Sequence, residues 1–271
     1  MICDMHIHSE VSHDGRESVD DIAKSCIEKR ISAFAITDHC DIQEIGQTDV
    51  FGLACKSVEN AIKAKEKYKD KVKVLVGIEI GEAILNLSYT NKLLNSFDFD
   101  VVIGSVHGIR YKGNDGSYSQ IDFSTFTDKM LNDYMSLYFD ELLETLQSIK
   151  FDIMAHLTCP LRYINGKYSR GVNSRNYEEQ ITKILEYIIK NQIAMEINTS
   201  GVNDDFTGLM PDLWIIEKYK KMGGNLITLG SDAHIKERVA NGFDKVMPLL
   251  KSMGFDTLCY FEKRQVSHYQ P

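Results

Sequence analysis

Six of the eight histidines in this chain of 271 residues lie at or near the carboxyl ends of expected β-strands. Five lie at or just past the carboxyl end of an expected β-strand, and one more follows the first of these by two residues. They are His6, His8, His39, His107, His156 and His234. Neutral imidazole is a strong ligand for zinc and other borderline transition metals. The placement therefore predicts a metal site, since histidines without a common role would be scattered over helices and the outer surface too.

The pair His6 and His8 closes the first expected strand. Side chains alternate along a strand with a period of two, so both imidazoles point to the same side. An isolated pair of this kind is often a surface feature. Because further histidines and carboxylates end other strands of this chain, we interpret His6 and His8 as metal ligands.

Two carboxylates follow the same pattern. Asp232 and His234 stand two residues apart at the end of the last expected strand and share one face. Glu79 ends the apolar run 72–79, where a buried carboxylate needs an ion pair or a metal ion. A salt bridge to a neighbouring helix is the alternative for Glu79. We expect all three side chains to be ligands.

Asp38 and His39 are neighbours, so on a strand their side chains point in opposite directions and do not bind the same ion. We expect His39 to be a ligand and Asp38 to support the site from behind it. Asp14, in the loop after the first strand, is on its own a turn residue, and His13 beside it is a loop residue. His268, close to the carboxyl terminus, is expected to take no part.

Short apolar runs alternate with longer amphipathic stretches along the chain, which is the pattern of a parallel α/β sheet. The expected strands are Ile2–Ile7, Ser32–Thr37, Lys73–Glu79, Val101–Val106, Asp152–Ala155, Ile193–Ile197 and Leu226–Gly230. The expected helices are Val19–Arg30, Phe51–Lys69, Thr125–Lys150, Tyr177–Asn191, Asp212–Met222 and Arg238–Met253. Seven strands that alternate with helices predict a closed or nearly closed (β/α) barrel, although an open doubly wound sheet would leave a similar trace.

No segment resembles a linker or a repeat, so we expect a single domain over residues 1–271. In a barrel, loops from every strand meet at the carboxyl-terminal face and build the active site there. The segment Gly108–Ser124 is rich in Gly, Asn, Asp and Ser and lacks periodicity. We interpret it as a loop or flap on the active-site side.

Composition excludes several classes of partner. A formal net charge of −8 argues against nonspecific binding to nucleic acid or anionic membranes. Apolar runs stay well short of the roughly 18 residues of a membrane span, and Asp4 stands where a signal peptide carries positive charge. We therefore expect a cytoplasmic protein without nucleic-acid or membrane partners. Its six scattered cysteines favour free thiols over a disulfide framework.

Together these segments resemble the PHP (polymerase and histidinol phosphatase) family. The matching stretches occur in family order: Asp4–Ser9, Thr37–His39, Gly77–Glu79, Gly104–His107, Ala155–His156 and Ser231–His234, with Glu196–Gly201 resembling the histidinol-phosphate phosphatase branch. The resemblance implies a distorted seven-stranded, TIM-like barrel with up to three divalent metal ions. Carried over residue by residue, the implied ligands are His6, His8, Asp14, His39, Glu79, His107, His156, Asp232 and His234. Mixed nitrogen and oxygen donors suit Zn, Fe or Mn.

One segment departs from the family pattern. After His156 we expect an acid and then basic residues, but Leu157–Tyr163 contains no acid. This departure does not change the prediction of a barrel, but it leaves the identity of the substrate open. Arg162 remains as a candidate phosphate-binding residue, because its guanidinium fork matches two phosphate oxygens. An exposed loop arginine is the alternative.

The chemistry that these residues favour is hydrolysis of a phosphate ester. Three divalent ions bring a charge of about +6, and Asp14, Glu79 and Asp232 return about −3, so the site attracts a phosphate dianion. A water molecule bridging two ions would be hydroxide near neutral pH and would attack phosphorus in line. The leaving alkoxide needs a proton, either from Asp232 or from a water molecule on a metal ion.

The resemblance implies L-histidinol phosphate as the small phosphorylated substrate, hydrolysed to L-histidinol and inorganic phosphate in histidine biosynthesis. Two alternatives stay open. The first is a PHP phosphoesterase that acts on another small phosphate ester, such as a nucleotide or a sugar phosphate. The second is a noncatalytic module that binds metal or phosphate, and the complete set of ligand-competent residues weighs against it.

Overall fold

The structure of the protein, a computed structural model, describes residues 1–113 and 116–270. Its main sheet runs in the order β1-β2-β4-β5-β6-β7-β8, and a short β3 pairs with β4. All of these neighbours are parallel. The strands are β1 (Cys3–Ile7), β2 (Ala33–Ile36), β3 (His39–Asp41), β4 (Lys73–Gly81), β5 (Val101–Ser105), β6 (Ile153–Met154), β7 (Ala194–Asn198) and β8 (Ile227–Gly230).

The sheet closes on itself between β1 and the segment that follows β8. The backbone N–H of His8 donates to the carbonyl of Ala233 at 2.9 Å, and that of Asp232 donates to the carbonyl of His6 at 2.8 Å. Ile7 and Ala233 form a parallel bridge at the same seam. The nearly closed barrel confirms the expected (β/α)7, TIM-like fold and excludes the open sheet.

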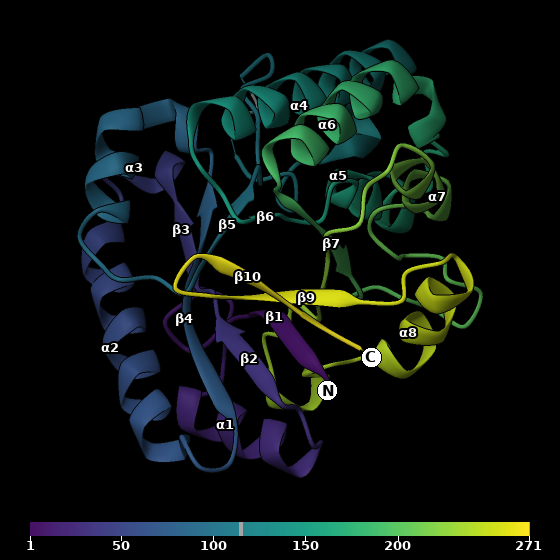
Figure 1. Ribbon diagram of the computed structural model, residues 1–271. Coiled ribbons are helices and arrows are strands. Elements are labelled where there is room, and N and C mark those ends of the chain that lie inside the picture. The colour runs from purple at the N-terminus through teal and green to yellow at the C-terminus, as the bar shows by residue number, and fades with distance from the viewer. Residues whose placement is uncertain (114–115, 271) are drawn as a thin grey trace.

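Helices surround the barrel (Figure 1). They are α1 (Val19–Glu28), α2 (Val50–Tyr68), α3 (Leu87–Leu94), α4 (Asp128–Ser148), α5 (Cys159–Leu161), α6 (Glu178–Asn191), α7 (Leu213–Lys221) and α8 (Phe243–Ser252). Single-turn elements join them: η1 (Ile42–Glu44), η2 (Ala83–Asn86), η3 (Phe123–Thr125), η4 (Arg162–Lys167), η5 (Ser174–Tyr177) and η6 (Lys236–Arg238). Among the described residues, none of these helices has both the length and the apolar character that crossing a membrane requires.

Two helix starts differ from the sequence prediction for local reasons. The last helix was expected from Arg238, but it begins at Phe243 because Gly242 adopts a left-handed conformation with φ 76°. The helix expected from Thr125 begins at Asp128, where the hydroxyl of Thr127 caps it by accepting the N–H of Met130 at 3.2 Å. Helix α3, strand β3 and the carboxyl-terminal hairpin were not predicted.

That hairpin, β9 (Leu258–Glu262) and β10 (Gln265–Tyr269), packs over the amino-terminal ends of barrel strands. The N–H of Lys263 donates to Asp100 Oδ1 at 3.1 Å, and the N–H of Arg264 donates to the Asp100 carbonyl at 2.9 Å. The Arg264 guanidinium also pairs with Asp152. Asp100 and Asp152 immediately precede β5 and β6, so the hairpin lies opposite the face where the strands end (Figure 1).

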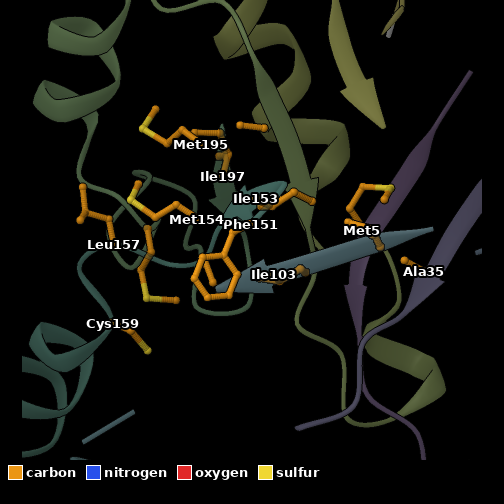
Figure 2. Close-up of a cluster of buried hydrophobic side chains, with 14 of the residues drawn as sticks. Met5, Ala35, Ile103, Phe151, Ile153, Met154, Leu157, Cys159, Met195 and Ile197 are labelled. Carbon is orange, nitrogen blue, oxygen red and sulfur yellow. The ribbon is translucent and has the colours of Figure 1, made fainter. Parts of the chain in front are cut away.

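A continuous hydrophobic core holds the strands at fixed positions. Figure 2 shows part of it, with labelled side chains from β1, β2, β5, β6 and β7 and the ring of Phe151, which precedes β6. Gly104 leaves room for that ring, since a Cβ at position 104 would lie 2.7 Å from it. Burying a side chain of this size stabilises the fold by about 1.5–3 kcal/mol.

Candidate metal centre

Glu79, on β4, is fully buried at the centre of the predicted ligands. Its Oε1 lies 3.0 Å from His156 Nε2 and 3.2 Å from His107 Nε2. Its Oε2 lies 2.9 Å from His39 Nδ1 and 3.3 Å from His6 Nε2. One carboxylate thus faces imidazoles from four other segments of the barrel. This arrangement differs from the salt bridge to a neighbouring helix that was the alternative for Glu79.

His6 and His8 point to the same side of β1, as their spacing predicted. Their Nε2 atoms are 3.0 Å apart, and both residues are fully buried. Asp232 Oδ1 lies 3.3 Å from His8 Nε2 and 3.9 Å from His6 Nε2. The first and last strands therefore bring two imidazoles and a carboxylate together across the seam of the barrel.

Asp14 belongs to the same cluster, although its local sequence is that of a turn. Its Oδ2 lies 3.0 Å from His234 Nε2, and its Oδ1 lies 3.7 Å from His39 Nε2. Gly15 allows this loop to fold tightly, because a Cβ at that position would lie 1.9 Å from the carbonyl oxygen of Ser9. Only the family resemblance had pointed to Asp14 as a ligand.

Asp38 supports the site from behind, as expected. It accepts hydrogen bonds from the N–H of Ser9 at 2.6 Å and from the Ser12 hydroxyl at 2.8 Å. The same Ser12 hydroxyl lies 3.1 Å from His8 Nδ1. Asp38 therefore orients His8 through Ser12 and does not face the cluster itself.

Two further carboxylates hold imidazoles, and neither was predicted from the sequence. Glu196 Oε1 lies 2.6 Å from His6 Nδ1, and Asp41 Oδ1 lies 2.9 Å from His107 Nδ1. Both residues carry a signal that was available. Glu196 interrupts an apolar strand as Glu79 does, and Asp41 stands two residues after His39, on the same face of a strand.

Two glycines make room for these carboxylates. A Cβ at Gly230 would lie 2.0 Å from Glu196 Oε1 and 2.8 Å from the Cβ of His6. A Cβ at Gly81 would lie 2.2 Å from Asp41 Oδ1. The absence of side chains at the ends of β4 and β8 is therefore part of how the site is built.

Two other buried acids fix the backbone around the cluster. Asp4 accepts hydrogen bonds from the N–H of Ser231 at 2.9 Å and the N–H of Ala240 at 2.8 Å, which secures the loop after β8. Glu82 accepts the backbone N–H of His107 and so fixes the end of β5. Burial raises the pKa of Asp4 to about 6 and that of Glu82 to about 8.

The shifted pKa values keep Glu79 and Asp232 in their ligand form but keep His6 protonated, so His6 would release a proton on binding a metal ion. Burial alone would raise the pKa values of Glu79 and Asp232, but the nearby imidazoles, His6 foremost, hold both well below their ordinary values. Burial alone would lower the pKa of His6, but Glu196 and Glu79 raise it well above the ordinary value. The pKa of His8 is lowered well below its ordinary value by burial and by other imidazoles.

The donor atoms fit divalent cations. His39 Nδ1, Glu79 Oε2 and His234 Nε2 are buried and have no hydrogen bond of good geometry. Lone pairs in this situation call for a cation. Five overlapping triads have their ligand atoms within 4.8 Å of one another: His8–His39–His234, His6–His8–Asp232, His6–Glu79–His156, His39–Glu79–His107 and Asp41–Glu82–His107. In the described part of the chain no cysteine joins these triads, and the six cysteines are free thiols, as predicted.

The cluster opens into a cavity of about 630 Å³ at the ends of the strands. His39, His107 and His234 line it, and so does Arg162. The Arg162 side chain is exposed, and its Nη1 donates to the Ser200 hydroxyl at 2.9 Å. The structure thus brings Arg162 to the mouth of the site rather than to a distant loop.

The expected flap forms one wall of this cavity. Residues 116–120 line it, whereas residues 114 and 115 of the same segment lie outside the described residues. Tyr118 holds the flap in place, because its N–H donates to the carbonyl of His107 at 2.8 Å and its ring packs 5.3 Å from the ring of Tyr163. Cys159 lines the cavity in the segment that lacks the expected acid, and burial raises the pKa of its thiol to about 11. An uncharged wall therefore takes the place of a carboxylate.

Two histidines remain outside the cluster, as expected. His13 is exposed at the rim of the cavity, where its ring lies 5.3 Å from that of His39. His268 is exposed on β10, in the hairpin at the other end of the barrel.

Comparisons of this chain with known proteins agree on one family. The PHP domain matches residues 4–200. A probable histidinol-phosphatase of Thermotoga maritima is 30% identical over 97% of both chains. The histidinol-phosphatase of Lactococcus lactis is 29% identical over 97% of this chain and 95% of its own. A crystal structure of histidinol phosphate phosphatase from Lactococcus lactis, complexed with zinc, L-histidinol and phosphate, has the same fold, with a TM-score of 0.80 at 23% identity and 98% coverage of each chain. The chain therefore belongs to the PHP domain family.

Proposed function

We propose that this protein is a metal-dependent phosphatase that hydrolyses L-histidinol phosphate to L-histidinol and inorganic phosphate. The observation that carries the proposal is the position of Glu79, a buried carboxylate facing four imidazoles beneath an open cavity. The substrate comes from the relatives, since proteins named histidinol-phosphatase match almost the full length of this chain.

The residues that would hold up to three divalent ions of Zn, Fe or Mn are those that the resemblance implied: His6, His8, Asp14, His39, Glu79, His107, His156, Asp232 and His234. When bound, such ions polarise a phosphate ester and activate water as a nucleophile. Glu196, Asp41 and the Ser12 hydroxyl hold three imidazoles by their second ring nitrogen, which fixes the directions of the remaining lone pairs.

Residues of the cavity outside the metal centre bind and orient the phosphate ester. The Arg162 guanidinium, exposed at the cavity mouth, offers two parallel donors to phosphate oxygens. Asp41 and Glu196 add negative charge beside the ligands, which lowers the net positive charge expected of the site. The positive charge of Arg162 therefore contributes more to attracting phosphate than the sequence suggested. Asp232 Oδ1 lies 3.3 Å from His8 Nε2, which supports its role as a ligand, and Asp232 and a water molecule on a metal ion remain the two candidates for the proton that the leaving alkoxide needs.

The cavity favours a small substrate over a polymer. Its volume of about 630 Å³ lies within the usual range of roughly 300–1,000 Å³ for small-molecule sites. Phosphate monoesters such as nucleotides and sugar phosphates remain the alternative substrates. A cytoplasmic location and a single domain over residues 1–271 stay predictions.

The test is phosphate release from a panel of L-histidinol phosphate, AMP, sugar phosphates and a short single-stranded DNA, with and without Mn²⁺ and Zn²⁺. We expect metal-dependent release with a strong preference for L-histidinol phosphate. Release from a different ester alone would retain the mechanism and reject the substrate. Absence of release from every member of the panel would favour the noncatalytic metal-binding or phosphate-binding module.

A further inference from the structure

Apart from the acids of the candidate metal centre, Asp14, Asp41 and Asp232, the charged side chains that line the cavity divide by the strands that carry them. Arg16, Arg162 and Arg238 line it from the segments that follow β1, β6 and β8. These strands lie within one continuous arc of the barrel, β6-β7-β8-β1. Glu44 lines the cavity from η1, which directly follows β3 beside β4. Outside the metal centre, cationic and anionic side chains therefore line the cavity from different sides.

Glu44 makes no interaction that explains its position. It is half-buried, and its carboxylate has no hydrogen bond or ion pair within residues 1–113 and 116–270. In the same described ranges the guanidinium groups of Arg16 and Arg238 are also unpaired. Unpaired charges that converge on a hollow are available to a ligand that carries both signs of charge.

The Glu44 side of the cavity extends outward. Gln43 and Gln47, which flank Glu44, line both the main cavity and a second hollow of about 240 Å³. Leu85 and Ile109 contribute apolar surface to this second hollow. A substrate whose phosphate lies at the metal cluster thus has room for a partly polar alcohol portion on the side of η1.

From this geometry we propose that Glu44 binds a cationic amino group on the leaving alcohol, so that the site selects phosphate monoesters of amino alcohols. The proposal rests on the proposed phosphatase function and identifies the side of the cavity that binds the leaving alcohol. Arg16, Arg162 and Arg238 attract the phosphate, and Glu44 accepts a charge-assisted hydrogen bond from the ammonium. An ester without the amine leaves this half-buried carboxylate unpaired, which is the basis of discrimination.

The test compares two esters that differ only in the amine: L-histidinol phosphate and 3-(imidazol-4-yl)propyl phosphate. At pH 7.5 the imidazole of both is mostly neutral, since its ordinary pKa is about 6.5. The metal-loaded wild-type protein, Glu44→Gln and Glu44→Lys are assayed for KM and kcat on each ester. Glu28→Gln, an exposed glutamate on α1 outside the cavity, is the matched control.

We expect Glu44→Gln to raise KM for L-histidinol phosphate about tenfold while changing KM for the analogue less than about twofold. Glu44→Lys should enlarge the effect on the amine-bearing ester, and Glu28→Gln should change neither KM. An equal change on both esters, or no change on either, would overturn the role of Glu44 and leave the phosphatase intact. Absence of turnover of both esters by the wild-type protein would instead reject the proposed function, and the assignment of Glu44 with it.

The variant is expected to fold, because the Glu44 side chain contributes no hydrogen bond to the described structure. Circular dichroism and the thermal midpoint of Glu44→Gln should therefore match those of Glu28→Gln. A lowered midpoint together with equal loss of kcat on both esters would show a structural role and overturn the proposal.

Discussion

Glu196 and His6 form the shortest contact between a carboxylate and an imidazole within the candidate metal centre, with Glu196 Oε1 2.6 Å from His6 Nδ1. The other oxygen of Glu196 accepts the backbone N–H of His156 at 2.7 Å. One side chain on β7 therefore orients an imidazole on β1 and fixes the backbone of a second candidate ligand after β6. Both contacts are buried, so water does not compete for them.

Replacing Glu196 with glutamine tests this relationship. The amide keeps the shape of the side chain but loses the charge that holds the His6 ring and raises the basicity of its ligating nitrogen. We expect metal affinity to fall about 10–100-fold, with activity partly restored by excess metal. Metal titration followed by phosphate release measures both quantities. Unchanged affinity would show that the Glu196 contact does not position His6.

A second prediction concerns the imidazole pair on β1. Replacing His6 and His8 together with alanine removes two candidate ligands, so turnover should fall by at least about a thousandfold. The barrel should remain, because its strands are held by backbone pairing and by the hydrophobic core. Activity and circular dichroism are the measurements, and His268→Ala, on the exposed hairpin, is the control. Retained activity in the double variant would contradict the metal-site hypothesis.

The fold could be predicted where periodicity was strong and not where it depended on tertiary contacts. The barrel strands ending at Ile7, Asn198 and Gly230 were expected to within a residue. Helix α3 was missed because its eight residues are too few to show a clear helical period. The β9–β10 hairpin is paired locally, but its place at the end of the barrel depends on contacts with distant residues. The pairing of Arg264 with Asp152, for example, spans more than 100 residues and leaves no local pattern.

The candidate site divides in a similar way. Residues at the ends of strands, such as Glu79 and Asp232, could be selected because a polar group there must have a partner. Asp14 could not, since only the folded loop brings it within 3.0 Å of His234. Glu196 was available by the argument used for Glu79, but its function became clear only from its contact with His6.

Glu141, on α4, predicts a pH dependence of stability that is independent of the metal centre. Burial, with the neighbouring Glu144, raises its pKa from 4.5 to about 7, although Arg110 opposes the shift. The folded state therefore binds more protons than the unfolded state between these values, and stability falls as the pH rises through about 7. Glu141→Gln should remove this loss, because the amide does not ionise. The loss is on the order of 1–2 kcal/mol, since a half-buried carboxylate keeps part of its hydration. Urea unfolding of both proteins at pH 5 and pH 8 measures it, and an equal pH dependence in both would contradict the assignment.

Arg162 provides the sharpest test of how the phosphate is bound. The side chain is exposed and donates only to the Ser200 hydroxyl among the described residues, so its removal should not disturb the fold. Arg162→Ala should raise KM for a phosphate monoester about tenfold, because a two-donor contact with the phosphate is lost. Arg162→Lys, which keeps the charge but not the fork, should give an intermediate KM. Ser200→Ala serves as the control for orientation and should have a smaller effect than Arg162→Ala. An unchanged KM in Arg162→Ala would remove this arginine from the site and leave phosphate binding to the metal cluster and the remaining cations of the cavity, Arg16 and Arg238.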